Sequence, residues 1–147
     1  MNKEALFQEL REQKIRLILE LKENVRNAHS MVDLDEIDTI DPEDLSHQNE
    51  GTELQRLFEE QLNRAEEDLL TLKHIDTTRK VEVFPGAIVF TQDFNFIVGI
   101  PALPFQFENT QFVGISTDSA IYAQMKGKHV GEEFKHAENK YRINQII

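Results

Sequence analysis

The sequence predicts an α+β protein in which an antiparallel helical hairpin of coiled-coil type, residues 1–76, precedes a small antiparallel β domain with one short helix, residues 77–147. Three observations predict it. In the first half, apolar residues recur at alternating steps of three and four, the period of a helix with one buried face. An acidic segment separates its two helical stretches. In the second half, short runs of alternating apolar and polar residues are punctuated by Pro and Gly, which is typical of strands and turns.

The first helix is expected from Lys3 to about Val32, because this stretch contains no Gly or Pro. Its apolar stripe consists of Ile18, Leu21, Val25, Ala28 and Val32. A second helix is expected to begin after Gly51, where Thr52 can cap it together with Gln55. Its stripe consists of Leu54, Phe58, Leu62, Ala65, Leu69 and Leu72. Two narrow stripes with charged opposite faces predict a hairpin that is buried only along its own seam.

Short strands are expected in the second half at residues 81–83, 87–90, 94–100, 112–115 and 141–147. Pro85-Gly86 forms a turn, and Ser119 can cap a short helix that ends at Gly127. Eight of the ten phenylalanines lie in this half. A domain of about 70 residues buries barely enough surface to fold, so we expect most of these rings in its core rather than in a ligand pocket.

The formal net charge of −11 belongs to the first half of the chain. Residues 1–75 hold 9 Lys/Arg against 19 Asp/Glu, whereas residues 76–147 hold 7 against 8. Binding to nucleic acid of any sequence depends on Lys and Arg that neutralise phosphates, so DNA or RNA is not expected to be the main partner. A basic protein surface or a metal fits the charge better.

The acidic segment, residues 33–50, is expected at the tip of the hairpin. It has no Lys or Arg, and its eight carboxylates are Asp33, Asp35, Glu36, Asp38, Asp41, Glu43, Asp44 and Glu50. Such a cluster repels itself unless a cation or a basic surface compensates it. A purely structural interpretation stays open, in which Asp41 is a helix N-cap, Pro42 the first helical residue and Asp44 an acidic third position.

Several classes of function are excluded or disfavoured. Nothing at the N-terminus resembles a signal peptide, and no apolar run approaches the roughly 20 residues that span a bilayer, so we expect a cytoplasmic protein without membrane contact. There is no Cys, and no two of the five His lie three or four residues apart, so a zinc site is not expected. A nucleophile elbow is also missing, because Gly114-Ile115-Ser116-Thr117-Asp118 lacks the closing Gly.

Several strings, in this order, resemble the bacterial Gre transcript cleavage factors over nearly the whole chain. In the second half they are Val83-Phe84-Pro85-Gly86-Ala87-Ile88-Val89, Val113-Gly114-Ile115-Ser116-Thr117-Asp118-Ser119-Ala120-Ile121, Gly127-Lys128-His129-Val130-Gly131-Glu132 and Tyr141-Arg142-Ile143-Asn144-Gln145-Ile146. In the first half, Asp44-Leu45-Ser46 is similar to the start of the family's tip motif. The resemblance implies a C-terminal domain with a fold like that of the FK506-binding proteins, which docks on RNA polymerase, and a hairpin that enters the secondary channel.

The resemblance also implies how the protein acts. Two tip carboxylates of the family help to hold a second Mg²⁺ and a water at the polymerase active site, and the polymerase then cuts the 3′ end of a backtracked transcript. Mg²⁺ prefers hard oxygen ligands and keeps waters, as this role requires. The factor would be no enzyme itself, would bind no cofactor stably, and would contact nascent RNA only indirectly. The candidate metal ligand is Asp44, with Asp41, Glu43, His47 and Glu50 as further tip residues.

The chain departs from the family pattern at both expected contacts. His47 stands at the second tip acid, and imidazole is a poor Mg²⁺ ligand. Another acid could substitute if the second helix is interrupted near Gly51, as Gly51-Thr52 suggests. In the docking turn, Asp118-Ser119-Ala120 has Ala in place of the family's Pro, and Ala123 replaces an arginine that often follows.

Other functions therefore stay open. A channel-binding regulator could occupy the polymerase without stimulating cleavage, as His47 favours. A coiled-coil adaptor is a further alternative. A peptidyl-prolyl isomerase on the same fold is disfavoured, because those sites are floored by Trp and this chain has none.

Overall fold

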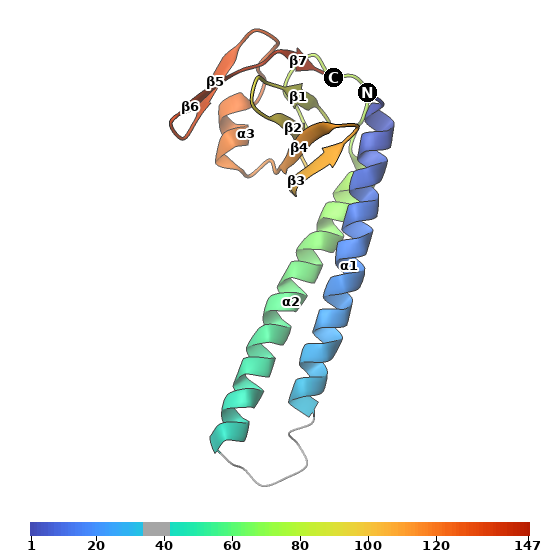
Figure 1. Ribbon diagram of the computed structural model, residues 1–147, viewed down its shortest axis with the longest axis vertical. Coiled ribbons are helices and arrows are strands. Elements are labelled where there is room, and N and C mark those ends of the chain that lie inside the picture. Colours follow the sequence, from blue (N-terminus) through green and yellow to red (C-terminus); the bar gives the residue numbers. More distant parts are fainter. Residues whose placement is uncertain (34–41) are drawn as a thin grey trace. The chain divides into compact units, whose positions relative to one another are not determined.

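A computed structural model describes residues 1–33 and 42–147, and the side chains of residues 1–31 and 49–147. Two long helices, α1 (Lys3–Asp33) and α2 (Pro42–His74), are followed by a small β domain (Figure 1). Contacts divide the chain into two compact units. The hairpin unit is Glu12–Leu69, and the β unit combines Met1–Arg11 with Leu70–Ile147. No helix in the described residues is long and apolar enough to cross a membrane.

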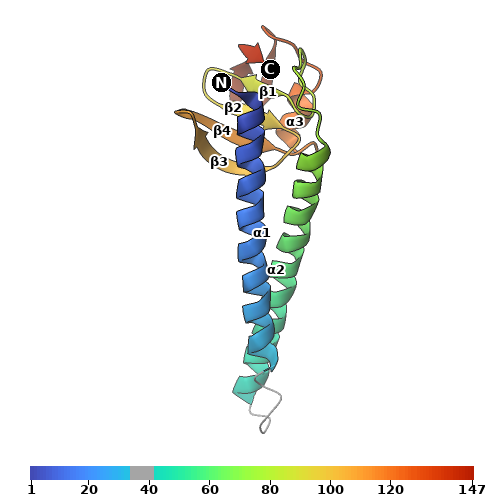
Figure 2. The ribbon, with the colours of Figure 1, turned by 90° about the vertical axis from the view of Figure 1, so that its right-hand side faces the viewer.

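Within the hairpin unit, α1 and α2 lie side by side and antiparallel, which confirms the predicted hairpin (Figures 1 and 2). The seam buries Ile18, Leu21 and Ala65, and the half-buried side chains of Phe58, Leu62 and Leu69 pack against them. Two ion pairs cross the seam, from Lys14 Nζ to Asp68 Oδ2 at 2.7 Å and from Lys22 Nζ to Glu66 Oε1 at 3.8 Å. The predicted first helix is confirmed to within one residue.

The predicted start of the second helix is wrong. Helix α2 begins at Pro42 and continues through Gly51 to His74, so Thr52 lies inside the helix and there is no interruption near Gly51. A single Gly costs a helix only about 1 kcal/mol relative to Ala, which a long helix with a packed face tolerates. Proline suits the first helical position because its missing N–H has no partner there. The alternative interpretation of Pro42 as the first helical residue is confirmed; its proposed cap, Asp41, lies outside the described residues.

The seam leads to a prediction about stability. Phe58→Ala is expected to lower the free energy of unfolding by about 2 kcal/mol, less than the roughly 3–5 kcal/mol of a fully buried Phe, because Phe58 is only half-buried. Urea denaturation followed by circular dichroism would measure it. Leu19→Ala is the matched control, because Leu19 lies on α1 and is 62% exposed. Its substitution should cost under about 0.5 kcal/mol. Equal losses in the two variants would contradict the observed seam.

The β unit contains a five-stranded sheet in the order β3-β4-β2-β1-β7 and a separate two-stranded ribbon, β5–β6. The elements are β1 (Ile88–Phe90), β2 (Asn95–Val98), β3 (Ala102–Phe107), β4 (Thr110–Ile115), α3 (Ala120–Met125), β5 (Glu133–His136), β6 (Asn139–Arg142) and β7 (Gln145–Ile146). All pairings are antiparallel except β2 with β4, which is parallel. The α+β class is therefore confirmed, and the sheet is mixed rather than wholly antiparallel. The chain reverses into β3 and again into β4, so β4 returns to the direction of β2.

Four features of this unit differ from the prediction. The expected strand at residues 81–83 is not formed, and its segment makes only an isolated bridge between Glu82 and His129. Strands β3 and β5 were not expected, and the expected closing strand 141–147 is divided between β6 and β7. The chain changes sheets at Ile143-Asn144, where the Ile143 N–H donates to Glu132 O at 2.9 Å and the Asn144 N–H to Phe90 O at 2.8 Å. Strand β3 contains Pro104, which is tolerated because β3 is an edge strand.

The sheet is buried on both faces. Val89, Phe96 and Val98 belong to one buried cluster, which also includes Tyr122 and Met125 of α3. The alternate residues Ile88 and Ile97 belong to a second cluster, together with Leu6, Phe7, Leu10 and Leu72 from the ends of the long helices. The first turns of α1 and the last of α2 are thus part of the β unit's core. Most of the eight phenylalanines pack in these clusters as predicted, but Phe84 and Phe94 are 50% and 47% exposed.

Candidate functional site

The second half of the acidic segment, residues 42–50, forms the start of α2. Glu43, Asp44 and His47 lie in its first two turns, and their backbone is helical. Their side chains are outside the described part of the chain, as is the whole of Asp41. Glu50 lies further along α2 and is exposed. The partial positive charge at a helix N-terminus stabilises acidic residues in the first turn, so Glu43 and Asp44 suit their positions without any ligand.

The net negative charge of the protein comes from the hairpin unit. Residues 12–69 hold 6 Lys/Arg against 17 Asp/Glu, which gives −11, whereas the β unit holds 10 against 10 and is neutral. The two cations nearest the acidic segment are engaged on their own helices. Arg26 pairs with Glu23 at 3.1 Å, and Arg56 pairs with Glu53 and Glu60, each at 2.6 Å. The hydrogen bond from Arg56 lowers the pKa of Glu53. The hairpin therefore suits a cation or a basic surface as its partner.

The predicted docking turn is held firmly in the β unit. Ser119 is the N-cap of α3: its Oγ accepts the Tyr122 N–H at 3.3 Å and donates to Ser116 O at 2.7 Å. Tyr122 and Met125 anchor α3 in the core. Asp118 and Ala120 flank the cap and are both exposed. The turn thus presents the Asp118 carboxylate to solvent on a fixed backbone, and the predicted cap is confirmed.

Two of the family-like strings are hydrogen-bonded to each other. The Val83 N–H donates to Lys128 O at 2.8 Å, and the Gly127 N–H donates to Val83 O at 2.9 Å. The Glu132 carboxylate accepts the His129 N–H at 2.6 Å, and this bond lowers the pKa of Glu132. Residues 83–89 and 127–132 therefore form one connected structure around the end of α3. The two predicted groups of site residues lie in different units, the acidic segment in the hairpin unit and the turn in the β unit.

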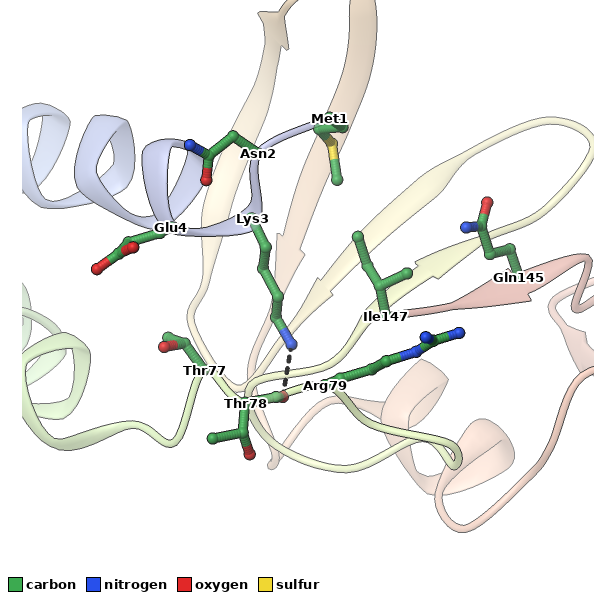
Figure 3. Close-up of a pocket in the computed structure, with 9 residues that line it drawn as sticks. All are labelled: Met1, Asn2, Lys3, Glu4, Thr77, Thr78, Arg79, Gln145 and Ile147. Carbon is green, nitrogen blue, oxygen red and sulfur yellow. Dashed lines mark hydrogen bonds between the residues drawn. The ribbon is translucent and has the colours of Figure 1, made fainter.

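The β unit also has pockets that the sequence analysis missed. One is lined by Met1, Asn2, Lys3, Glu4, Thr77, Thr78, Arg79, Gln145 and Ile147 (Figure 3). Lys3 Nζ reaches across it and donates to Thr78 O at 2.9 Å. Burial, and secondarily the nearby Lys80, lower the pKa of Lys3 to about 8. The Lys3 ammonium already donates to Thr78 O. This hydrogen bond joins the start of α1 to the segment after α2, so we assign Lys3 a structural role.

A second pocket gathers three lysines. It is lined by Gln124, Lys128, Glu133, Phe134, Lys135 and Lys140. These residues are spread over 17 positions of the chain, and they come together through the pairing of β5 with β6 and the packing of α3 against β5. Among the described residues, no group of three or more His, Asp or Glu is placed to hold a metal ion.

The comparisons with known proteins gave a structural neighbour and no sequence relative. No protein-family model matches the chain, and no curated protein sequence matches it. Among solved structures, the chain is similar to the crystal structure of GreA factor homolog 1 (Gfh1) of Thermus thermophilus. The TM-score is 0.37 at 15% identity, over 93% of this chain and 94% of that one. The fold described above rests on this chain's own elements and not on that likeness.

Proposed function

We propose that this protein binds RNA polymerase and acts on paused or backtracked elongation complexes, where it promotes cleavage of the transcript's 3′ end. The β unit would dock on the polymerase, and the hairpin would enter the secondary channel and carry the acidic segment to the active site. The protein would supply no active site of its own and bind no cofactor stably. It would contact nascent RNA only indirectly, and it would work in the cytoplasm with the polymerase.

The observation that carries this proposal is the conjunction of the docking turn with the acidic segment. The string that resembles the Gre factors, residues 113–121, forms the end of β4, an exposed turn and the capped start of α3. The same chain has a helical hairpin whose net charge is −11 and whose second helix begins within the acidic segment. Neither feature alone would point to the polymerase.

The chemistry proposed for the acidic segment is metal sharing. Asp44 would complete the ligand set of a Mg²⁺ held mainly by the polymerase. A water bound to that Mg²⁺ would be the group that attacks the transcript. A carboxylate oxygen is the ligand type that Mg²⁺ prefers, and two-metal sites stabilise both the attacking and the leaving oxygen. The other acids of the segment, Asp41, Glu43 and Glu50, would contribute negative potential.

A second candidate function is occupation of the channel without cleavage. His47 favours it, because imidazole would replace the second carboxylate. The continuity of α2 through Gly51 also favours it, because no break in the helix is available to turn Glu50 toward the start of α2. Both candidates require polymerase binding, and they differ only in the effect on the backtracked transcript.

Comigration of the purified chain with core RNA polymerase tests both. The full chain should bind, and Asp118→Arg should weaken binding, because reversing a charge at a desolvated contact costs several kcal/mol. Ser119 must stay unchanged in this test, because the loss of this N-cap would itself destabilise the start of α3 by about 1 kcal/mol. Glu108→Arg reverses another exposed charge, in the β3–β4 turn, and serves as the control.

The outcomes separate the alternatives. Equal binding by wild type and Asp118→Arg would remove the turn from the interface. No comigration of wild type would reject both polymerase functions and leave the adaptor. The full chain is needed, because residues 77–147 alone would lack Leu6, Phe7, Leu10 and Leu72, which bury one face of the sheet.

A further inference from the structure

The β5–β6 ribbon has one apolar and one charged face. Phe134 and Tyr141 are directly paired across it, and their rings stack at 5.3 Å in the buried cluster. Alternate residues of a strand point to opposite faces. The other face therefore carries two cross-strand pairs, Glu133 with Arg142 and Lys135 with Lys140, and all four side chains are exposed.

The charged face has an excess of positive charge. Lys135 and Lys140 are directly opposite each other, and like charges in that position repel. Lys140 forms an ion pair with Glu133, and its hydrogen bond lowers the pKa of that carboxyl. Within the described part of the chain, Lys135 and Lys128 form no ion pair. The single carboxylate on this face is thus already paired with Lys140, and the Lys135 ammonium keeps an uncompensated positive charge. Lys128, which follows α3, interacts electrostatically with the Glu132 carboxylate but forms no ion pair with it.

These ammonium groups border a hollow. Gln124 of α3, Lys128 after it, Lys135 of β5 and Lys140 of β6 line a pocket of about 320 Å³ where the ribbon lies beside α3 (Figure 1). That volume is at the small end of ligand sites. The lining holds three Lys against one Glu, although the protein as a whole carries −11.

We infer that this hollow is a phosphate-binding site. A phosphate with two negative charges would neutralise Lys128 and Lys135 together and relieve the repulsion between Lys135 and Lys140. Lysine binds phosphate as a point charge with three donors, and the Gln124 amide can add a neutral donor. The phosphate could belong to a small phosphorylated molecule or to the backbone of a single-stranded nucleic acid. The only aromatic ring in the lining, Phe134, is 3% exposed and offers no face for a base to stack on, so no base preference is expected.

Binding is tested with the full chain and no polymerase, so the result is independent of the proposed function. Pyrophosphate, ADP and a short oligouridylate are titrated while backbone amide NMR signals are followed. We expect saturable shifts at Gln124, Lys128, Lys135 and Lys140. Lys128→Gln and Lys135→Gln should each weaken binding about tenfold, the loss expected for one hydrogen bond to a charged group. Lys126→Gln is the matched control, because Lys126 is exposed and does not line the pocket.

The three probes identify the source of the phosphate. Similar affinities for pyrophosphate and ADP, with no gain for the oligouridylate, support a small ligand. Tighter oligouridylate binding that falls steeply with salt, and depends on the same two lysines, supports a nucleic-acid backbone. Three results would overturn the inference: no saturable shifts with any probe, equal losses from Lys126→Gln, or binding only to a polyglutamate control, which would indicate an acidic protein surface instead.

Discussion

Asp44→Asn is expected to leave polymerase binding unchanged and to abolish the acceleration of transcript cleavage. In a backtracked elongation complex with labelled 3′ RNA and Mg²⁺, the wild type should speed the release of short 3′ fragments, and the variant should not. The physical reason is charge. An asparagine oxygen cannot replace the carboxylate that compensates a second Mg²⁺.

The same variant separates the metal role from the structural one. Asp44 is the third residue of α2, where an acid stabilises the helix start. Losing the charge of a first-turn acid costs about 0.3–1 kcal/mol, which a long packed helix tolerates. A purely structural Asp44 therefore predicts that Asp44→Asn retains cleavage. Glu43→Gln is the control, because it removes the same charge one residue earlier and should keep most of the acceleration.

His47 decides what a negative result means. If wild type binds polymerase but does not speed cleavage, the blocking function is supported. His47→Glu would then restore the second carboxylate three residues after Asp44 and should confer cleavage. If neither wild type nor His47→Glu speeds cleavage while both bind, the metal role of this segment is rejected.

The long helices show how much of a helical structure can be predicted from the spacing of apolar residues. The stripe from Ile18 to Ala28 predicted α1 correctly, because a helix with one apolar face needs a partner along that face. The same pattern could not reveal that Leu6, Phe7 and Leu10 pack under the sheet rather than along the seam. A helix stripe records that a face is buried, not what buries it. The domain boundary predicted at residue 76 marks the change from helical to strand periodicity. The compact units divide the chain elsewhere, within α1 after Arg11 and within α2 after Leu69.

Local signals misplaced the start of α2. Thr52 and Gln55 make a plausible capping pair after Gly51, yet Pro42 within an acidic run was the stronger start signal. The lysine pocket was missed for a different reason. Lys128, Lys135 and Lys140 have no sequence period in common, and they meet only through the register of β5 with β6 and the packing of α3 against β5. Strand β5 itself was not predicted, so the cluster could not be either.

Gly86→Ala is expected to be the most destabilising single substitution that we consider, because two independent costs coincide there. Gly86 has φ +88°, a conformation that costs an L-residue roughly 1–2 kcal/mol. In addition, a Cβ at Gly86 would lie 2.0 Å from the backbone oxygen of Asp76, far inside van der Waals contact. We expect the free energy of unfolding to fall by more than about 3 kcal/mol, since overpacking against a fixed backbone adds its own 1–3 kcal/mol.

Asp76 has little freedom to move away. It lies two residues after the end of α2, its Oδ1 accepts the Thr78 N–H at 2.9 Å, and Lys80 pairs with its other oxygen. The hydrogen bond from Lys80 is the main reason why the pKa of Asp76 lies well below its usual range. A shift of Asp76 would also pull on Leu72, which is fully buried at the end of α2. The backbone around Gly86 therefore cannot relax without disturbing the core.

Gly131→Ala isolates the steric part of this cost. Gly131 has φ +90°, close to the value at Gly86. Each of the two glycines also donates its N–H to a backbone carbonyl at 2.8 Å, Gly131 to Ile143 O and Gly86 to Val98 O. A Cβ at Gly131 would meet nothing within 4 Å. Urea denaturation should therefore give a loss of only about 1–2 kcal/mol for Gly131→Ala. A Gly86→Ala protein that does not unfold cooperatively, beside a folded Gly131→Ala protein, would support the contact with Asp76. Equal losses in the two variants would show that backbone conformation alone sets the cost, and that the turn at Pro85-Gly86 does not hold the end of α2 in place.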